Sequence, residues 1–488
     1  MDIPRIEIAR CGKGSLQTEG GTTILHIKGT AYERGWQHGF LLAEKISITV
    51  PRGLTAAAAV CGKAIGGVEE GLEKLRQGKE EARGFMPPEF VEEIRGMADA
   101  LAARGSALDF EDMLTWNLMY DTWCFYAHPD PGDIHADFAR SPYPEAIGCS
   151  SFSAWGRATR DGRLIFGKNM DNLDLPGIPE GRILVFCDPA KGFGHANVTQ
   201  AGMLAIDGGF NEAGIAMMTH YSGSVHETMR GCGIGTLTRL VLQNAASVEE
   251  AIDILNTRPR CTGINYHIAD ANAMKAAVVE ANAKETAVRR PFERDVLWCT
   301  NHSNCYPGWM GYQGRNMVEA QGPVFRLKDI STVEAWQASL RETENGNIAA
   351  AGRFRRYEKM IDESYGSLDM GKGMEILSDR HHPDSGEQRG WETPARSRND
   401  GVTICYLLPR RIYAEKARFY KSGEEGPITG QATNLWSVMA APASGDLHVA
   451  LEGLPAQRQG YRHFNLFKEL GHRLPKIWAH SRGGEGKP

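Results

Sequence analysis

The chain has 488 residues, of which 42% are hydrophobic and 24% charged, a composition that is ordinary for a soluble globular protein. A net charge of −5 and a pI of about 6.3 give no long-range field that would recruit nucleic acid or an acidic membrane surface. The length would suffice for about three average domains, but large α/β enzymes often form one core at such a length.

The N-terminal residues are mixed and polar, and they lack the apolar segment of a signal peptide. No stretch approaches the run of about 20 apolar residues that a membrane-spanning helix needs. The ten cysteines are scattered without a CxxC pair, so the sequence predicts neither a zinc ribbon nor a dithiol site. We therefore expect a reduced, cytoplasmic protein that uses no metal and no other cofactor.

Helical patterns dominate the chain before residue 148. Apolar residues recur at helical spacing over 31–48, and the segment 88–105 begins with proline and ends with glycine, the usual signals of a helix start and stop. Another amphipathic segment follows Asp109. It carries the aromatic cluster of residues 115–126, which is more often core than pocket; lining an acyl pocket is the alternative.

Strand patterns dominate after residue 149. Short apolar runs bounded by turn residues begin at residues 164, 182, 214, 276, 402, 435 and 447. A helical stretch lies between them at 235–256, and Ser247 has the spacing to Glu250 of a capping box. The segment 371–400, rich in Asp, Arg, His, Gly and Pro, is interpreted as a long loop. Strand blocks separated by helix blocks predict an α+β fold of stacked antiparallel sheets flanked by helices.

The most informative segment is IGCSSFSAWGRATRDGRLIFGKNMDN, residues 147–172. An Asp-Gly pair in its middle is a strong hairpin-turn signal. The hairpin should fold Lys168, Asn169 and Asp171 back beside Cys149. We therefore expect a thiol, a cation, an amide and a carboxylate to converge at one end of the two strands.

A cysteine thiol at pH 7 is only a few per cent thiolate, so it needs activation to act as a nucleophile. One route is a histidine partner. The other is the cysteine's own α-amine, freed by cleavage of the preceding peptide bond, which titrates at about 7.7–8.0. Gly148 favours the second route, because glycine adds no Cβ beside the attacked carbonyl and tolerates a strained backbone. Taken alone, however, a Gly-Cys pair is more often a buried core cysteine at the start of a strand.

Three further segments accompany the Gly-Cys pair in a fixed order along the chain. They are GTAYERGWQHG (29–39), GFNEAGIAMMTH (209–220) and CTNHSN (299–304). Together with residues 147–172, they resemble the motifs of the self-cleaving family of acyl-CoA:6-aminopenicillanic acid acyltransferase, within the N-terminal-nucleophile hydrolases. A weaker resemblance links them to choloylglycine hydrolase.

The resemblance implies a four-layer αββα sandwich of the N-terminal-nucleophile hydrolase type, with a helical N-terminal segment. It also implies that the chain cuts itself between Gly148 and Cys149. The products would be an N-terminal chain of residues 1–148 and a catalytic chain of residues 149–488 that begins with its nucleophile.

The resemblance also implies roles for individual residues. Cys149 matches the nucleophile, with its α-amine as the base, and Asp171 matches the acid that holds and orients this amine by charge-assisted hydrogen bonding. Asn301 matches the amide side chain of the oxyanion hole. A second donor to the oxyanion should come from the backbone near His220, and loss of one such donor typically costs about 10²–10³ in rate.

The sequence departs from the family pattern at two places. Lys168 stands where choloylglycine hydrolases have arginine, which replaces a bidentate clamp by a point charge and weakens a bile-salt interpretation. Lys168 and its neighbour Asn169 are candidate contacts of the substrate or oxyanion. The family also has a late arginine just before a GlyValThr segment; Asp400 occupies that position here, and Arg398 is the candidate nearby.

Other residues have plainer interpretations. His381 and His382 could face a substrate or a metal, but adjacent histidines on a loop are more often solvated. His38 is better explained by packing or capping at a helix entry. The run ArgPheArgArg at 353–356 predicts a solvated helix face, with binding of an anionic substrate tail as the alternative.

These residues allow three functions. In an amidohydrolase, Cys149 attacks a linear amide, and water releases the acid from an acyl-enzyme. In an acyltransferase, an amine or a CoA thioester takes part in one of the two steps. The third hypothesis is an uncleaved binding protein with an unreactive Cys149. Either enzyme would act on a small amide or acyl compound, without nucleic acid or membrane, and we expect a homo-oligomer of processed heterodimers.

Overall fold

The computed structural model describes residues 4–62, 67–126, 148–223, 226–291, 294–304, 348–394, 403–405 and 407–471. Its helices are α1 (Ala31–Leu41), α2 (Ala43–Gly62), α3 (Val68–Ala82), α4 (Pro88–Ala103), α5 (Phe110–Tyr126), α6 (Ile178–Gly181), α7 (Ile234–Asn244), α8 (Val248–Thr257), α11 (Ile348–Ser364), α12 (Met370–Leu377) and α13 (Leu466–Glu469). In this part of the chain, no helix combines the length and apolar character that crossing a membrane requires.

Two sheets form the centre of the molecule. The larger one has the order β1 (Arg5–Cys11), β2 (Gly14–Glu19), β3 (Thr22–Gly29), β6 (Arg182–Pro189), β7 (His195–Gln200), β8 (Gly208–Asn211), β9 (Ile215–Tyr221), β10 (Ile264–Asp270), β11 (Lys275–Ala281) and β12 (Thr286–Arg289). The smaller one has the order β13 (Val296–Cys299), β4 (Gly148–Ala154), β5 (Ile165–Leu173), β15 (Glu425–Ala441), β16 (Asp446–Ala450) and β17 (Arg462–Asn465), and β14 (Leu407–Arg418) pairs with β15.

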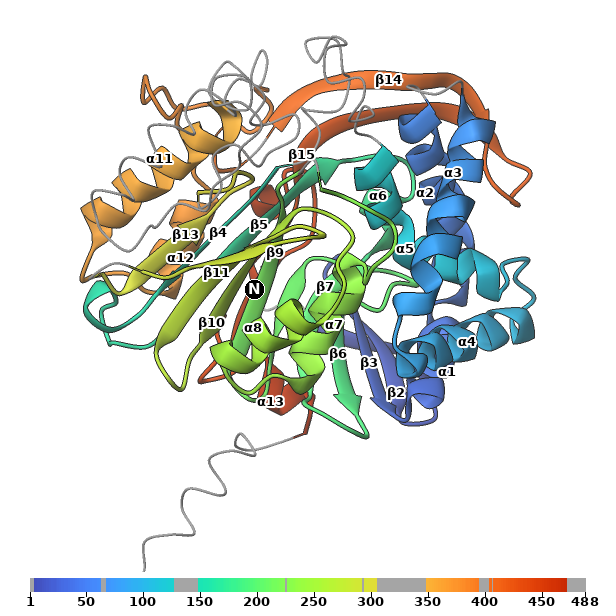
Figure 1. Cartoon of the computed structure of the whole chain (residues 1–488), viewed down its shortest axis with the longest axis horizontal. Helices are drawn as coiled ribbons and strands as arrows, with labels where there is room; N and C mark the ends of the chain where they lie inside the picture. The colour runs from blue at the N-terminus through green and yellow to red at the C-terminus, as the bar shows by residue number, and fades with distance from the viewer. Residues whose placement is uncertain are drawn as a thin grey trace, which may run out of the picture.

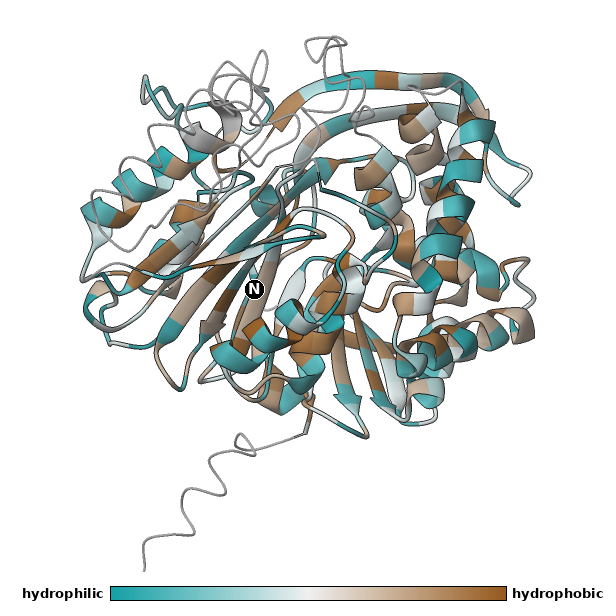
Figure 2. Ribbon diagram, viewed as in Figure 1, coloured by the Kyte–Doolittle hydropathy of each residue, from teal (hydrophilic) through white to brown (hydrophobic). Residues whose placement is uncertain are grey.

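The sheets lie face to face between two helical layers (Figure 1). Strand β4 of the smaller sheet packs on β9 of the larger one, and β13 packs on β10 and β11. Helices α7 and α8 cover the outer face of the larger sheet, whereas α11 and α12 cover the smaller sheet. Figure 2 shows hydrophilic residues on the outward side of α11 and hydrophobic ones along the enclosed strands. This arrangement confirms the predicted α+β fold with αββα layers.

The N-terminal segment differs from the expected purely helical one. Strands β1–β3 precede its helices and extend the larger sheet, and β3 runs parallel to β6, with Ile24 opposite Leu184. The other strand pairs of the described residues are antiparallel, as predicted. Strand β1 was not predicted because it is an edge strand with Ile6 and Ile8 both exposed, so its sequence shows no buried face.

Three element boundaries also differ from the predictions. The helix expected over 31–48 is two helices, divided at Leu42. The segment expected to be a loop from residue 371 begins inside α12, because Asp369 caps this helix by accepting a hydrogen bond from the Lys372 N–H. The strand expected from residue 402 begins at Leu407, and shortly before it the Cys405 N–H donates to the carbonyl of Asp379, a residue outside any sheet.

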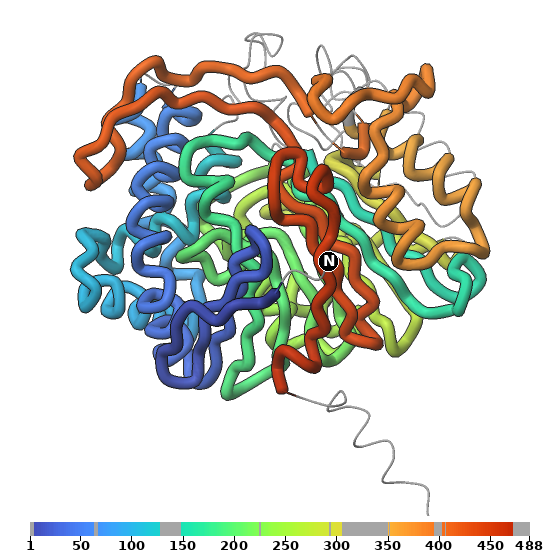
Figure 3. Tube along the Cα trace, turned by 180° about the vertical axis from the view of Figure 1, so that it is seen from behind, coloured from blue at the N-terminus to red at the C-terminus, as the bar shows by residue number. Residues whose placement is uncertain are grey.

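The β14–β15 hairpin joins the N-terminal helices to the rest of the molecule. It arches over one side of the molecule and reaches the helices α2 and α3 (Figure 3). At its tip, the Tyr420 N–H donates to Thr55 Oγ1 at 2.8 Å, and Lys421 Nζ lies 2.6 Å from Asp112 Oδ2. The hairpin therefore fastens the segment before residue 148 to the segment after it.

Candidate active site

The predicted nucleophile hairpin is present. Strands β4 and β5 pair so that Gly148 lies opposite Asp171 and Cys149 opposite Met170. The connection between them is longer than a two-residue turn, and it contains Gly162 in the left-handed conformation with φ of 77°. Both strands are fully buried, because one face packs on the larger sheet and the other on helices.

The predicted convergence of four polar groups at one strand end is only partly correct. Successive side chains of a strand point to opposite faces. Lys168 points toward the larger sheet, where its Nζ lies 2.9 Å from Asp207 Oδ1 and donates to the Thr219 carbonyl. Asn169 points the other way, and its Nδ2 donates to the Leu377 and Ile404 carbonyls at 2.8 and 3.1 Å. Asn169 therefore anchors backbone and does not face the thiol.

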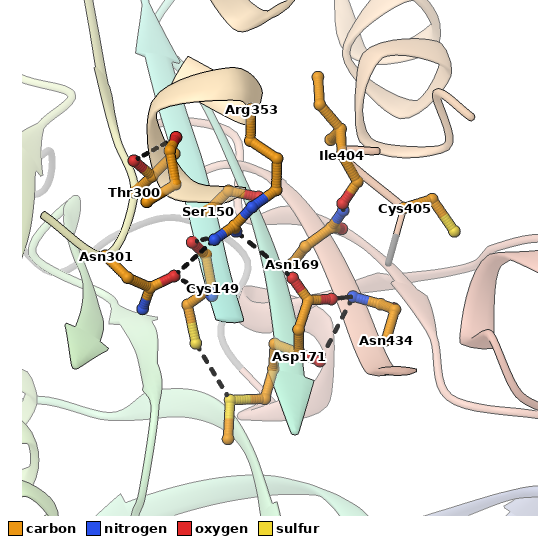
Figure 4. A network of polar contacts seen from close by, with 12 residues as sticks. Cys149, Ser150, Asn169, Asp171, Thr300, Asn301, Arg353, Ile404, Cys405 and Asn434 are labelled. Atoms are coloured by element: carbon orange, nitrogen blue, oxygen red, sulfur yellow. Dashed lines mark hydrogen bonds and ion pairs between the residues drawn. The ribbon is translucent and has the colours of Figure 1, made fainter. Parts of the chain in front are cut away.

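Cys149 is enclosed, with 3% of its surface exposed. Its backbone N–H donates to Asn301 Oδ1 at 2.6 Å, and its carbonyl accepts a hydrogen bond from Arg353 Nη1 at 2.8 Å (Figure 4). Its sulfur lies 3.5 Å from Met170 Sδ. Burial raises the pKa of the thiol to about 11, although the Lys168 charge acts to lower it. In the intact chain, this cysteine is therefore a protonated thiol.

Asn301, the residue matched to the oxyanion hole, lies next to Cys149. Its Oδ1 accepts hydrogen bonds from both the Cys149 N–H and Arg353 Nη2, the latter at 2.9 Å. Because two donors face Oδ1, the orientation of the amide is fixed, and Nδ2 points to the Tyr221 carbonyl at 2.9 Å. Tyr221 directly follows His220, so the amide nitrogen of Asn301 contacts the backbone segment from which a second oxyanion donor was expected.

Asp171 lies on the opposite side of the hairpin from Lys168. Its Oδ1 accepts a hydrogen bond from Asn434 Nδ2 at 2.9 Å, and Arg353 Nη1 lies 3.7 Å from its Oδ2. Burial raises the pKa of Asp171 to about 7, while Arg353 and Asn434 act against this rise. The carboxyl therefore changes its charge near neutral pH.

Arg353 is the site residue that the sequence analysis did not assign. The run 353–356 was interpreted as a solvated helix face, but Arg353 is 2% exposed and contacts Cys149, Asn301 and Asp171. The spacing of residues along this helix indicates that Arg353 is buried. Ala350, Arg353, Phe354, Tyr357 and Ile361 are all buried, and their spacing is that of one helix face. Arg353 thus occupies the inward stripe of α11.

The remaining candidates lie away from the thiol or make other bonds. His220 is buried and donates from Nδ1 to the Asn265 carbonyl, 3.2 Å away, and burial lowers its pKa well below the ordinary value. His38 accepts a hydrogen bond from the Gly202 N–H at 2.9 Å, which agrees with a packing role. His381 bonds to Asp379 at 2.6 Å. Arg398 and Asp400 lie outside the described residues.

The aromatic cluster of α5 belongs mainly to the core. Trp116 and Trp123 are almost fully buried, and Trp116 Nε1 donates to the Ala201 carbonyl at 3.0 Å. These contacts join α5 to the segment after residue 148. Within the ranges given above, no group of three or more His, Cys, Asp or Glu side chains is arranged to hold a metal ion.

Three similarities to known proteins accompany this geometry. The family described as Acyl-coenzyme A:6-aminopenicillanic acid acyl-transferase matches residues 157–409, just over half of the chain. An uncharacterized protein of Archaeoglobus fulgidus is 26% identical over 395 residues, covering 78% of this chain and 61% of that protein. Protein dcd1B of Dictyostelium discoideum is 21% identical over 340 residues, covering 61% of this chain and 62% of that protein.

The chain spans about three fifths of the length of these curated relatives. Among solved structures, penicillin V acylase from Agrobacterium tumefaciens is similar with a TM-score of 0.37 and 15% identity, over 62% of this chain and 83% of that one.

Proposed function

Because the chain belongs to the acyl-coenzyme A:6-aminopenicillanic acid acyl-transferase family, we propose that it is a self-cleaving enzyme that breaks linear amide bonds through a cysteine acyl-enzyme. One observation carries the proposal. The Cys149 nitrogen, which cleavage would turn into an α-amine, lies 2.6 Å from Asn301 Oδ1, in a hairpin where Asp171 faces Gly148. The contact of Asn301 with this nitrogen supports the proposal, and Asp171 would be the second group that holds the free amine.

Self-cleavage starts with attack of the Cys149 sulfur on the Gly148 carbonyl carbon. The carbon–nitrogen bond breaks, the nitrogen takes up a proton, and Gly148 is left in a thioester. Water then hydrolyses this thioester, which leaves a carboxylate on Gly148 and returns the thiol. The Arg353 guanidinium bonds to the Cys149 carbonyl and so holds the residue in place while its nitrogen changes from amide to amine.

Turnover then uses the new α-amine as the base. A buried thiol with a pKa of about 11 is not a thiolate at neutral pH, so proton transfer to a neighbouring amine is needed. The thiolate attacks the amide carbonyl of the substrate, and the protonated amine gives its proton to the leaving nitrogen. Water resolves the acyl-enzyme by the same route and releases the acid.

The oxyanion of each step would be stabilised by Asn301. Its Oδ1 only accepts, here from Cys149 and Arg353, so the donor to an oxyanion is Nδ2, one of whose two hydrogens is used by the Tyr221 carbonyl. The second hydrogen remains for the oxyanion. A backbone N–H near His220 would be the other donor.

Acyl transfer is the second candidate function, and the family description favours it. In that reaction an amine replaces water at the acyl-enzyme, or a CoA thioester supplies the acyl group. Burst kinetics with and without an added amine separate the two functions. If no amine ever competes with water, the protein is a hydrolase.

Denaturing mass spectrometry of the wild type and of Cys149→Ala tests the proposal directly. We expect two wild-type fragments, one ending at Gly148 and one beginning at Cys149, and an intact variant. An intact wild-type chain whose Cys149 does not react with iodoacetamide would instead favour the uncleaved binding protein. The cytoplasmic location stays a prediction from the sequence.

A further inference from the structure

We propose that Asn265 and Glu280 are positioning residues that hold the loop of residues 300–304 so that Asn301 meets the nucleophile. The inference rests on the proposed function, in which Asn301 stabilises the oxyanion. It concerns the two residues that fix the backbone of this loop from the larger sheet. Neither side chain belongs to the motifs that point to the active site.

Asn265 holds the loop on both sides of Asn301. Its Nδ2 donates to the Thr300 carbonyl at 3.1 Å and to the His302 carbonyl at 2.9 Å, and these two residues flank Asn301. Asn265 lies on β10 two residues before His267, whose imidazole bonds to Ser151 Oγ of β4 at 2.7 Å. Because alternate residues share a face, Asn265 also points toward the smaller sheet.

Glu280 holds the end of the same loop from the neighbouring strand. It lies on β11 directly opposite Asn265. Its two oxygens accept from the Asn304 N–H at 3.0 and 3.1 Å, and Ser303 Oγ also donates to it. Its partner Arg289 lies 3.3 Å away and donates to the Trp298 carbonyl at 3.0 Å, on the strand that leads into the loop.

The cross-strand pair of Asn265 and Glu280 therefore supplies the loop with both hydrogen-bond donors and hydrogen-bond acceptors. Asn265 gives donors to two carbonyls, and Glu280 gives acceptors to an N–H and a hydroxyl. The loop has no regular structure and is buried, and a buried polar group that loses a hydrogen bond typically costs about 1–3 kcal/mol. Both side chains are fully buried.

The loop is also tied to the helix that carries Arg353. Thr300 Oγ1 donates to the Ala350 carbonyl of α11 at 3.2 Å, and Figure 4 shows Asn301 and Arg353 meeting at the backbone of Cys149. A shift of the loop would move the Asn301 amide relative to the thiol. A misplacement of about 1 Å at an active site can cost about 100-fold in rate.

The test compares Asn265→Asp with the matched control Asn211→Asp. The carboxylate keeps the shape of the side chain but has no N–H to donate. Asn211 is equally buried, and its Nδ2 also donates to two carbonyls, those of Leu242 and Ala245 at 3.0 and 2.8 Å, far from the loop. Glu280→Gln is the second variant; it acts on the other end of the loop and keeps one acceptor oxygen.

Two measurements are made on these variants. Hydrogen–deuterium exchange of the peptide 296–304 is recorded in an intact Cys149→Ala background, which matches the uncleaved chain. Turnover is recorded on self-processed protein with N-acyl p-nitroanilides of graded acyl length. We expect Asn265→Asp to speed exchange of the peptide at least about tenfold and to lower kcat about 10–100-fold with little change in KM. We expect Glu280→Gln to act in the same direction and Asn211→Asp to change neither quantity.

The inference is overturned if Asn265→Asp leaves the exchange of the peptide unchanged, or if Asn211→Asp lowers kcat as much as Asn265→Asp. Should Asn265→Asp not fold, Glu280→Gln decides by the same two readouts. A wild type that is active on no amide would overturn the proposed function alone. In that case the exchange of the peptide still decides whether Asn265 and Glu280 hold the loop.

Discussion

The carboxyl of Asp171 lies opposite the residue whose peptide bond the proposed cleavage would break. In the intact chain its pKa is raised to about 7, chiefly by burial and against the effect of Arg353. A group whose folded pKa is raised stabilises the fold fully below its unfolded value of about 3.9, and this contribution is lost as the pH rises through about 7.

We therefore predict a pH-dependent difference between Cys149→Ala and Cys149→Ala/Asp171→Asn. The Tm of the first variant should fall more steeply between about pH 4 and pH 8 than that of the double variant. Asp121, whose pKa burial also raises to about 7, is present in both variants, so the slope should become smaller and not vanish. Parallel Tm profiles would show that Asp171 does not titrate in this range.

Arg353 makes three contacts that a lysine could not reproduce. Its planar guanidinium bonds at once to the Cys149 carbonyl and to Asn301 Oδ1, whereas an ammonium is a point charge without a fixed fork. Arg353→Lys should slow fragment formation and turnover about 100-fold while the Tm changes little. The control is Arg355→Lys, because Arg355 lies on the same helix but pairs with Asp384 at the surface. Equal losses in the two variants would contradict the role of Arg353.

At the scale of single residues, the sequence predicted the parts of the site that lie in local motifs. Cys149 and Asp171 belong to one hairpin, and Asn301 belongs to a short segment with its own pattern. Arg353 was missed because it reaches Cys149 across 204 residues of sequence. An arginine in a run with two others is usually solvated. That Arg353 is buried becomes clear only when the whole buried face of its helix is considered.

At the scale of elements, the sequence predicted the hairpin but not how its two faces divide the polar groups. Strand alternation sends Lys168 toward Asp207 and the larger sheet, and Asp171 toward α11 and β15. The prediction of one converging cluster overlooked this period of two. In a strand that is buried on both faces, the alternation of side chains is also hard to recognise from the sequence. Both faces then carry apolar residues, or polar residues that pair with other elements.

At the scale of the whole molecule, composition and element order predicted the layers of the fold. The place of the N-terminal segment depends on long-range strand pairing. The parallel pairing of β3 with β6 joins residues that lie more than 150 positions apart, which no local pattern indicates. This pairing places the N-terminal segment inside the larger sheet. If the chain is cleaved, the N-terminal chain should therefore remain part of the fold, and the processed heterodimer stays a prediction.

A buried ionic network also connects the segment before residue 148 to the segment after it. Glu93 of α4 accepts a hydrogen bond from Arg34 Nε at 3.0 Å and lies 3.2 Å from Arg239 Nη2 of α7. All three side chains are about 1% exposed. Burial would raise the pKa of Glu93, but the two arginines lower it below its ordinary value. Glu93 is therefore ionised in the folded protein, and it links the segment before residue 148 to Arg239 in the segment after it.

We predict that Glu93→Gln weakens the association of the two chains. Removing the Glu93 charge takes the buried carboxylate from Arg239 and leaves Arg34 with its contact to the more exposed Glu89, and breaking a buried ion pair typically costs about 3–5 kcal/mol. Native mass spectrometry of cleaved protein in increasing urea should release the N-terminal chain of Glu93→Gln well before that of the wild type. Glu92→Gln is the control, because Glu92 precedes Glu93 on α4 and is exposed. Because β3 and the β14–β15 hairpin also hold the N-terminal segment, the heterodimer of Glu93→Gln should persist without urea. Its dissociation under those conditions would mean that the network, and not the strand pairing, holds the chains together.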